Sequence, residues 1–216
     1  MTHIAIVLYD GFDALDAIGP WEVFRKAGHL GAPLSTGFVA RAGATRVESS
    51  DGLPMTGLAS LEEDASPWIL VPGGVWASRA SRGAWGEIER GDLPRIFAER
   101  KARGTLFATV CTGAMFLSVA GIARGRAMTT HAVAKAALGE AGAHVLDARV
   151  VDDGDLLSSA GVTAGIDLAL WMVEKLASRE IAERVRRNLE WTSVAAVAHG
   201  TGPGHDRPGR RGLATR

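Results

Sequence analysis

Cysteine is nearly absent from this sequence, and neither sign of charge is in excess. Cys111 is the only cysteine in 216 residues, so no internal disulfide can form and we expect a reducing compartment such as the cytoplasm. The 24 Lys and Arg balance the 24 Asp and Glu. We therefore expect no general affinity for nucleic acid, because neutralising phosphates requires an excess of basic residues. Metal-ligand spacings and nucleotide-binding glycine motifs are also missing, so we expect no metal and no cofactor.

Long hydrophobic runs are scarce too. The N-terminus lacks the basic start and small-residue cleavage site of a signal peptide. One uncharged stretch, Thr105 to Ala123, is 19 residues long and could in principle span a bilayer. It contains glycines, hydroxyl residues and the cysteine, and it begins with the strand-like run LFATV. We expect a buried strand, turn and helix there, and no membrane partner.

Hydrophobic residues make up 47% of the chain, enough for a packed core. Apolar runs that predict strands alternate with segments of helical periodicity, an order typical of an α/β fold whose mostly parallel sheet is sandwiched between helices. The predicted strands are His3–Tyr9, Gly37–Arg41, Pro67–Val71, Thr105–Val110 and Val145–Val151, and the predicted helices are Pro20–Ala27, Leu93–Arg103, Ala132–Ala141, Ile166–Leu176 and Ser178–Trp191.

Two segments, 47–56 and 149–158, predict β-hairpins added to this sheet, the second turning at Asp153 and Gly154. We expect a single domain over residues 1–199. Residues 200–216, rich in Gly, Pro and Arg, are expected to form a separate tail.

The cysteine lies where a predicted buried strand runs directly into a predicted helix opened by Thr112 and Gly113. This arrangement is typical of a nucleophile elbow, the sharp turn that presents a side chain at the carboxyl edge of a sheet. Unpaired N–H groups at a helix start lower the pKa of a thiol and can stabilise an oxyanion. The alternative is that Cys111 is an inert core residue.

Three further segments are expected to reach the same edge. Asp16 follows the first strand in an apolar setting, where its pKa would be raised; alternatively it caps a helix. Gly73 and Gly74 follow the strand that ends at Val71, and their N–H groups are candidate oxyanion donors or part of an ordinary turn. His131 begins a later helix, where it could orient a carbonyl, serve as a base, or be only a helix-start residue with a satisfied hydrogen bond.

Four motifs together resemble the ThiJ/PfpI superfamily, whose fold is like that of the class I glutamine amidotransferases. They are DALDAIGPWEVF, VPGG, ATVCTGAMFLSVAGIARGRAMTTH and LLSSAGVTAGIDLALWMVE. The CTG elbow, the LDxxGP loop and the TTH segment are similar to those of isonitrile (isocyanide) hydratases in particular. The resemblance implies Cys111 as nucleophile, Asp16 as acid–base partner and Thr112 as a neighbour that holds the substrate or the sulfur. Ile18, in the LDxxGP loop, and His131, in the TTH segment, become candidates to contact the substrate.

The resemblance implies hydration of small organic isocyanides to N-substituted formamides through a covalent thioimidate, by a homodimer. Two departures bear on the alternatives. Thr112 stands where PfpI-type peptidases place histidine, and Asp16 stands where glyoxalase-like and deglycase-like members usually place glutamate. A glyoxalase III-like or deglycase-like enzyme acting on 2-oxoaldehydes, and a non-enzymatic redox-sensing or chaperone-like dimer, remain the alternatives.

Overall fold

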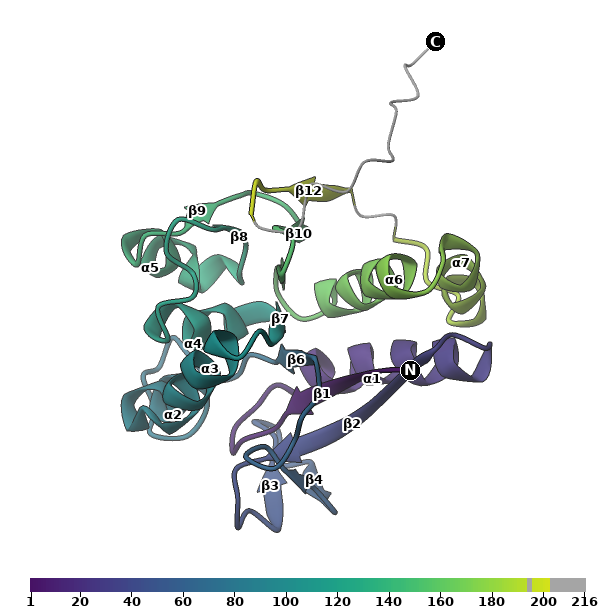
Figure 1. The fold of residues 1–216 in the computed structure, drawn as a ribbon. Helices are drawn as coiled ribbons and strands as arrows, with labels where there is room; N and C mark the ends of the chain where they lie inside the picture. Colours follow the sequence, from purple (N-terminus) through teal and green to yellow (C-terminus); the bar gives the residue numbers. More distant parts are fainter. Residues whose placement is uncertain (194–195, 203–216) are drawn as a thin grey trace.

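An eight-stranded, mostly parallel sheet runs through the molecule (Figure 1). The computed structural model describes residues 1–193 and 196–202. The strand order is β12-β10-β11-β7-β6-β1-β2-β5, and β10 and β11 form the antiparallel pair. The strands of this sheet are β1 (Thr2–Val7), β2 (Leu34–Ala40), β5 (Ala59–Ser60), β6 (Trp68–Val71), β7 (Leu106–Thr109), β10 (Val150–Asp152), β11 (Leu156–Ser159) and β12 (Val197–His199).

Helices cover both faces of the sheet, as the α/β pattern predicts (Figure 1). On one face α1 (Ala14–His29) packs on α6 (Ala164–Leu176) and α7 (Arg179–Asn188). The other face carries α2 (Ala84–Arg90), α3 (Asp92–Ala102), α4 (Ala114–Val119) and α5 (Lys135–Glu140). Between these helices and the sheet, the Phe97 ring packs edge to face on Phe107 and on Phe116, with centroids 5.6 and 6.1 Å away respectively. These contacts hold α3 and α4 against β7.

Small two-stranded sheets complete the fold. The predicted hairpin 47–56 is confirmed as β3 (Arg46–Glu48) paired with β4 (Pro54–Thr56), and the second predicted hairpin is the β10–β11 pair. The single strand predicted over Val145–Val151 is wrong. That segment divides between β9 (His144–Val145), which pairs with β8 (Ala127–Met128), and β10 of the main sheet. The chain bends between them at residues 146–149.

The end of the described chain lies on the β10–β11 hairpin. β12 pairs with β10, after which the Gly200 N–H donates to the Asp152 carbonyl at 2.9 Å and the Gly202 N–H to Asp153 Oδ1 at 2.7 Å. The start of the predicted tail is thus hydrogen-bonded to the domain, and residues 203–216 lie outside the described part. Within residues 1–193 and 196–202, no helix has the length and apolar character needed to cross a membrane.

Candidate active site

Cys111 occupies a strained turn at the carboxyl end of β7. Its φ is +57°, a left-handed value that is costly for any residue with a Cβ. The turn is fixed on both sides, because the Cys111 N–H donates to the Ala160 carbonyl at 3.1 Å and its own carbonyl accepts from Thr130 Oγ1 at 2.7 Å. This is the geometry of the predicted elbow, and a strained backbone held by several neighbours is a common feature of functional sites.

The helix after the cysteine begins more tightly than predicted. Residues Cys111–Gly113 form a single 3₁₀ turn, and α4 begins only at Ala114. Glycine is required at position 113, because a Cβ there would lie 2.1 Å from the Val71 carbonyl oxygen. The elbow therefore presses directly on the end of the neighbouring strand β6.

Thr112 is hydrogen-bonded to the glycine pair, Gly73 and Gly74, at its second residue. Thr112 Oγ1 accepts from the Gly74 N–H and donates to the Gly74 carbonyl, both at 3.1 Å. The Gly73 N–H donates to Asp16 Oδ2 at 2.9 Å. Both glycine N–H groups are thus already used, so the expected role of Gly73 and Gly74 as free oxyanion donors does not fit this geometry.

Asp16 lies in the first turn of α1, which begins six residues before the predicted Pro20 start. The helix is capped by Asp13, whose Oδ1 accepts from the Leu15 and Asp16 N–H groups, so the capping role considered for Asp16 belongs to Asp13. Asp16 is fully buried. Its Oδ2 is held by Gly73, whereas Oδ1 has no hydrogen-bond partner among the described residues. One carboxyl oxygen is therefore anchored by the backbone, and the carboxyl also interacts with the Cys111 thiol.

Burial dominates the ionisation of both groups. Loss of water, reinforced by the nearby Asp13 charge, raises the pKa of Asp16 to about 8. Loss of water and the adjacent Asp16 carboxylate raise the pKa of the Cys111 thiol to about 12. The expectation that the helix start would lower the pKa of this thiol is therefore wrong, because desolvation outweighs the N–H donors. At neutral pH, Asp16 is a protonated acid beside a sulfur.

Two backbone N–H groups do face the sulfur. Hydrogen bonds from Thr112 and Val162 to Cys111 favour the thiolate and partly offset burial. Val162, in the loop before α6, was not singled out in the sequence. Its φ is +44°, a strained value for a β-branched residue. The only signal in the sequence was the short polar loop SSAGVT at the end of the β11 segment.

The two remaining candidates make no described direct contact with Cys111 or Asp16. Ile18 is half-buried in α1 two positions after Asp16, and positions two apart on a helix point in different directions. His131 caps a 3₁₀ turn, because its Nδ1 accepts from the Val133 N–H at 3.2 Å. The helix-start contact considered for His131 is present, and its ring also lies against Gly161, directly before Val162.

Tyr9 adds a buried neighbour that the sequence did not reveal. Its hydroxyl donates to the Pro72 carbonyl at 3.0 Å, directly before Gly73. Its ring packs on Phe116, with centroids 5.1 Å apart. Burial, with the charges of Asp16 and Cys111, raises the pKa of Tyr9 well above its ordinary value, so the phenol stays protonated and keeps this donor role. Among the described residues, no group of three or more His, Cys, Asp or Glu side chains could hold a metal ion.

Known proteins are similar to this chain over most of its length. The chain is 29% identical over 200 residues to an isonitrile hydratase from Pseudomonas putida, covering 92% of this chain and 82% of that protein. It is 30% identical to the Parkinson disease protein 7 homolog of Danio rerio, covering 85% and 94%. The crystal structure of Drosophila melanogaster DJ-1beta superposes with a TM-score of 0.73 at 26% identity, covering 89% and 99%.

The family model described as the DJ-1/PfpI family matches residues 2–175. This span contains the elbow, the glycine pair, Asp16 and Val162. The chain is a member of the DJ-1/PfpI family, with a cysteine at the nucleophile elbow.

Proposed function

We propose that this protein hydrates small organic isocyanides to N-substituted formamides, with Cys111 as nucleophile and Asp16 as acid and base. The observation that carries the proposal is the buried Asp16 carboxyl, which is anchored through one oxygen and unpartnered at the other beside the only cysteine. A pKa of about 8 makes this group a proton donor at neutral pH. The similarity to an isonitrile hydratase supports the same assignment.

The first step needs a nucleophilic sulfur and a proton donor together. As the sulfur of Cys111 bonds to the terminal carbon of R–N≡C, the proton of the Asp16 carboxyl passes to that carbon, and the S–H proton passes to the other carboxyl oxygen. The product is the thioimidate R–N=CH–S–Cys111, and Asp16 is again protonated. The Thr112 and Val162 N–H groups stabilise the negative charge that develops on the sulfur as it loses its proton.

The second step uses the same acid and base. The Asp16 carboxyl protonates the thioimidate nitrogen, and its other oxygen accepts a proton from water as the hydroxyl adds to the carbon, giving the tetrahedral adduct R–NH–CH(OH)–S–Cys111. The adduct collapses to R–NH–CHO as the C–S bond breaks and the hydroxyl proton passes through Asp16 to the sulfur. The sum is one isocyanide and one water consumed for one formamide, with the Cys111 thiol and the protonated Asp16 restored.

The test is formamide production from a panel of alkyl and aryl isocyanides. Cys111→Ala should abolish turnover. Asp16→Asn preserves the acceptor for the Gly73 N–H but cannot donate the same proton, and we expect kcat to fall by about 10²–10⁴. Asp51→Asn, a solvent-exposed carboxyl, is the matched control and should retain full activity. Full activity of Cys111→Ala, or no formamide from any isocyanide, would contradict the proposal.

The same preparation separates the alternatives. A glyoxalase III-like or deglycase-like enzyme would convert methylglyoxal and leave isocyanides unchanged. A redox-sensing or chaperone-like dimer would turn over neither, and peroxide treatment of Cys111 would alter its association with a partner.

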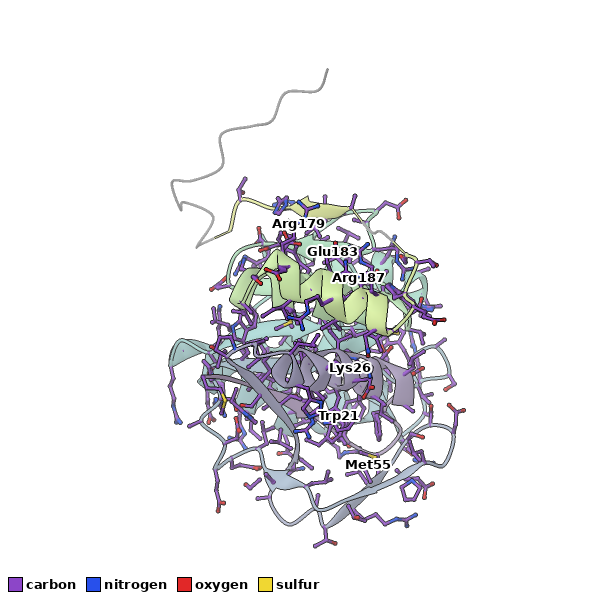
Figure 2. All side chains as sticks on the ribbon, turned by 90° about the vertical axis from the view of Figure 1, so that its right-hand side faces the viewer. Trp21, Lys26, Met55, Arg179, Glu183 and Arg187 are labelled. Atoms are coloured by element: carbon purple, nitrogen blue, oxygen red, sulfur yellow. The ribbon has the colours of Figure 1, made fainter. Side chains whose placement is uncertain are left out.

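We also propose that the protein acts as a homodimer, through the face shared by α1, α7 and the β4 strand of the hairpin. Figure 2 shows Trp21, Met55 and Arg187 on this face, one from each part. Trp21 stacks on Phe38 with centroids 5.8 Å apart, yet both side chains remain half-buried. Trp21→Glu should shift the mass measured by light scattering to that of a monomer, whereas Val133→Glu, at a residue 55% exposed elsewhere, should not.

A further inference from the structure

A polar cleft, separate from the Cys111 site, lies beyond the carboxyl ends of β1 and β2. We call it the arginine cleft. It has a volume of about 690 Å³ and is lined by Asp10, Arg46, Val47, Glu48, Ser81, Arg82, Glu87 and Arg90. A recess of about 270 Å³ shares five of these residues and extends inward to Leu8 and Tyr9. Its size and its place at the carboxyl edge of the sheet are typical of sites for small molecules.

The acceptors in the arginine cleft are largely used by its own donors. Glu48 accepts from Arg46 at Oε2 and from Arg82 at Oε1, at 2.8 and 3.1 Å. Both oxygens of Glu87 accept from Arg90. The acidic side chains therefore orient the guanidinium groups more than they attract a cation.

The donors are in surplus. Arg46 donates through Nη2 to Glu48, and Arg82 donates through Nη2 to Glu48 and to the Ser49 carbonyl. The Nε and Nη1 groups of both arginines have no hydrogen-bond acceptor in the described part of the chain. Two guanidinium groups oriented by one carboxylate, each with donors to spare, suit a ligand rich in acceptor oxygens.

The floor of the arginine cleft is held in place by an ion pair to a buried carboxylate. Glu87 is only 7% exposed, and its ion pair with Arg90 at 2.5 Å fixes that guanidinium against the Ser81 carbonyl. Asp10 joins the cleft to the hairpin, because its Oδ1 accepts from the Glu48 N–H at 2.9 Å. Segments following β1, at the start of β3 and around α2 thus meet at one place.

We propose that the arginine cleft binds a small oxyanion, a carboxylate or a phosphate group, through Arg46 and Arg82. Buried Tyr9 lines the inner recess, its ring packs on Phe116 and its hydroxyl donates to the Pro72 carbonyl. The inference does not depend on the proposed hydratase activity.

Isothermal titration with inorganic phosphate and with benzoate, at an ionic strength held constant with sodium chloride, tests the proposal. Wild-type protein should give a saturable one-site isotherm with at least one of the two anions, and the one that binds tells phosphate from carboxylate chemistry. In the double variant Arg46→Gln, Arg82→Gln the affinity should fall at least tenfold. Arg95→Gln, on α3 and paired only with Glu99, is the matched control and should bind as the wild type does.

Urea unfolding of the three proteins shows whether the substitutions have damaged the fold, and we expect closely similar midpoints, since these are exposed ion pairs. Absence of saturable binding of both anions to the wild type would overturn the inference. Undiminished binding by the double variant would do so too.

Discussion

Cys111 and Val162 are neighbours in the site, and both have a left-handed backbone conformation. Both have positive φ, +57° and +44°, although neither is glycine, and the Val162 N–H is hydrogen-bonded to the Cys111 sulfur. A left-handed conformation costs an L-residue roughly 1–2 kcal/mol, more for a β-branched one. The fold holds both strained residues so that an N–H group points at the thiolate.

The strain at Val162 can be measured by comparing glycine with alanine at that position. Val162→Gly should be more stable than Val162→Ala by about 1 kcal/mol, because only glycine adopts φ +44° without cost. Val133, exposed in a 3₁₀ turn, is the control position, and there glycine should be the less stable variant by about 0.5–1 kcal/mol. Urea unfolding of the four variants checks both signs. The same order at both positions would contradict the strain.

Burial of Asp16 should make stability depend on pH in a specific direction. Its pKa in the folded state, about 8, lies above the ordinary value of 3.8, so the folded state binds this proton more tightly than the unfolded state does. The contribution of Asp16 is therefore fully present below pH 3.8 and is lost as the pH rises through about 8. Asp16→Asn removes this titration.

The measurement is the free energy of unfolding of both proteins between pH 4 and 9. Relative to Asp16→Asn, the wild type should become steadily less stable as the pH rises. A constant difference across that range would show that Asp16 is ionised throughout.

Much of the architecture could be predicted from sequence because apolar strand runs are strong signals. The strands β1, β6 and β7 and the elbow cysteine all follow from them. The start of α1 could not be predicted, because Pro20 resembles a first-turn proline but lies inside the helix. Val162 was missed for a different reason. Its importance comes from a backbone N–H and a torsion angle, and neither depends visibly on residue type.

The ionisation of the thiol could not be predicted from local sequence either. The prediction considered the donors at the helix start, but Cys111 is only 6% exposed and lies against the Asp16 carboxyl. The balance between burial and the two N–H donors depends on the long-range contacts of α1 with Gly73 after β6 and with Cys111 after β7. These contacts join residues far apart in the chain.

Coupling between the two groups predicts how Cys111 reacts with iodoacetamide. Below pH 8 Asp16 is protonated and does not oppose the thiolate, so the wild type and Asp16→Asn should alkylate at similar rates at pH 6–7. Above pH 8 the carboxylate raises the pKa of the thiol, and the variant should react at least about tenfold faster at pH 10, since one unit of pKa changes the thiolate fraction tenfold.

The single cysteine makes this experiment direct, because the mass shift reports Cys111 alone. Equal rates at all pH values would mean that the two side chains do not interact. A faster reaction of the variant already at pH 6 would mean that Asp16 is ionised at that pH.

The tight packing of the elbow predicts opposite effects of the same substitution at two helix glycines. A Cβ at Gly113 would lie 2.1 Å from the Val71 carbonyl oxygen, so Gly113→Ala must push the elbow away from β6 and separate Cys111 from Asp16. At Gly139 in α5 the nearest atom would be 3.7 Å away, an ordinary contact. We expect Gly113→Ala to cost about 2 kcal/mol or more of unfolding free energy. Gly139→Ala should stabilise by about 0.5–1 kcal/mol, because alanine has the higher helix propensity. Urea unfolding measures both, and a neutral Gly113→Ala with unchanged alkylation of Cys111 would show that the elbow tolerates a side chain at this position.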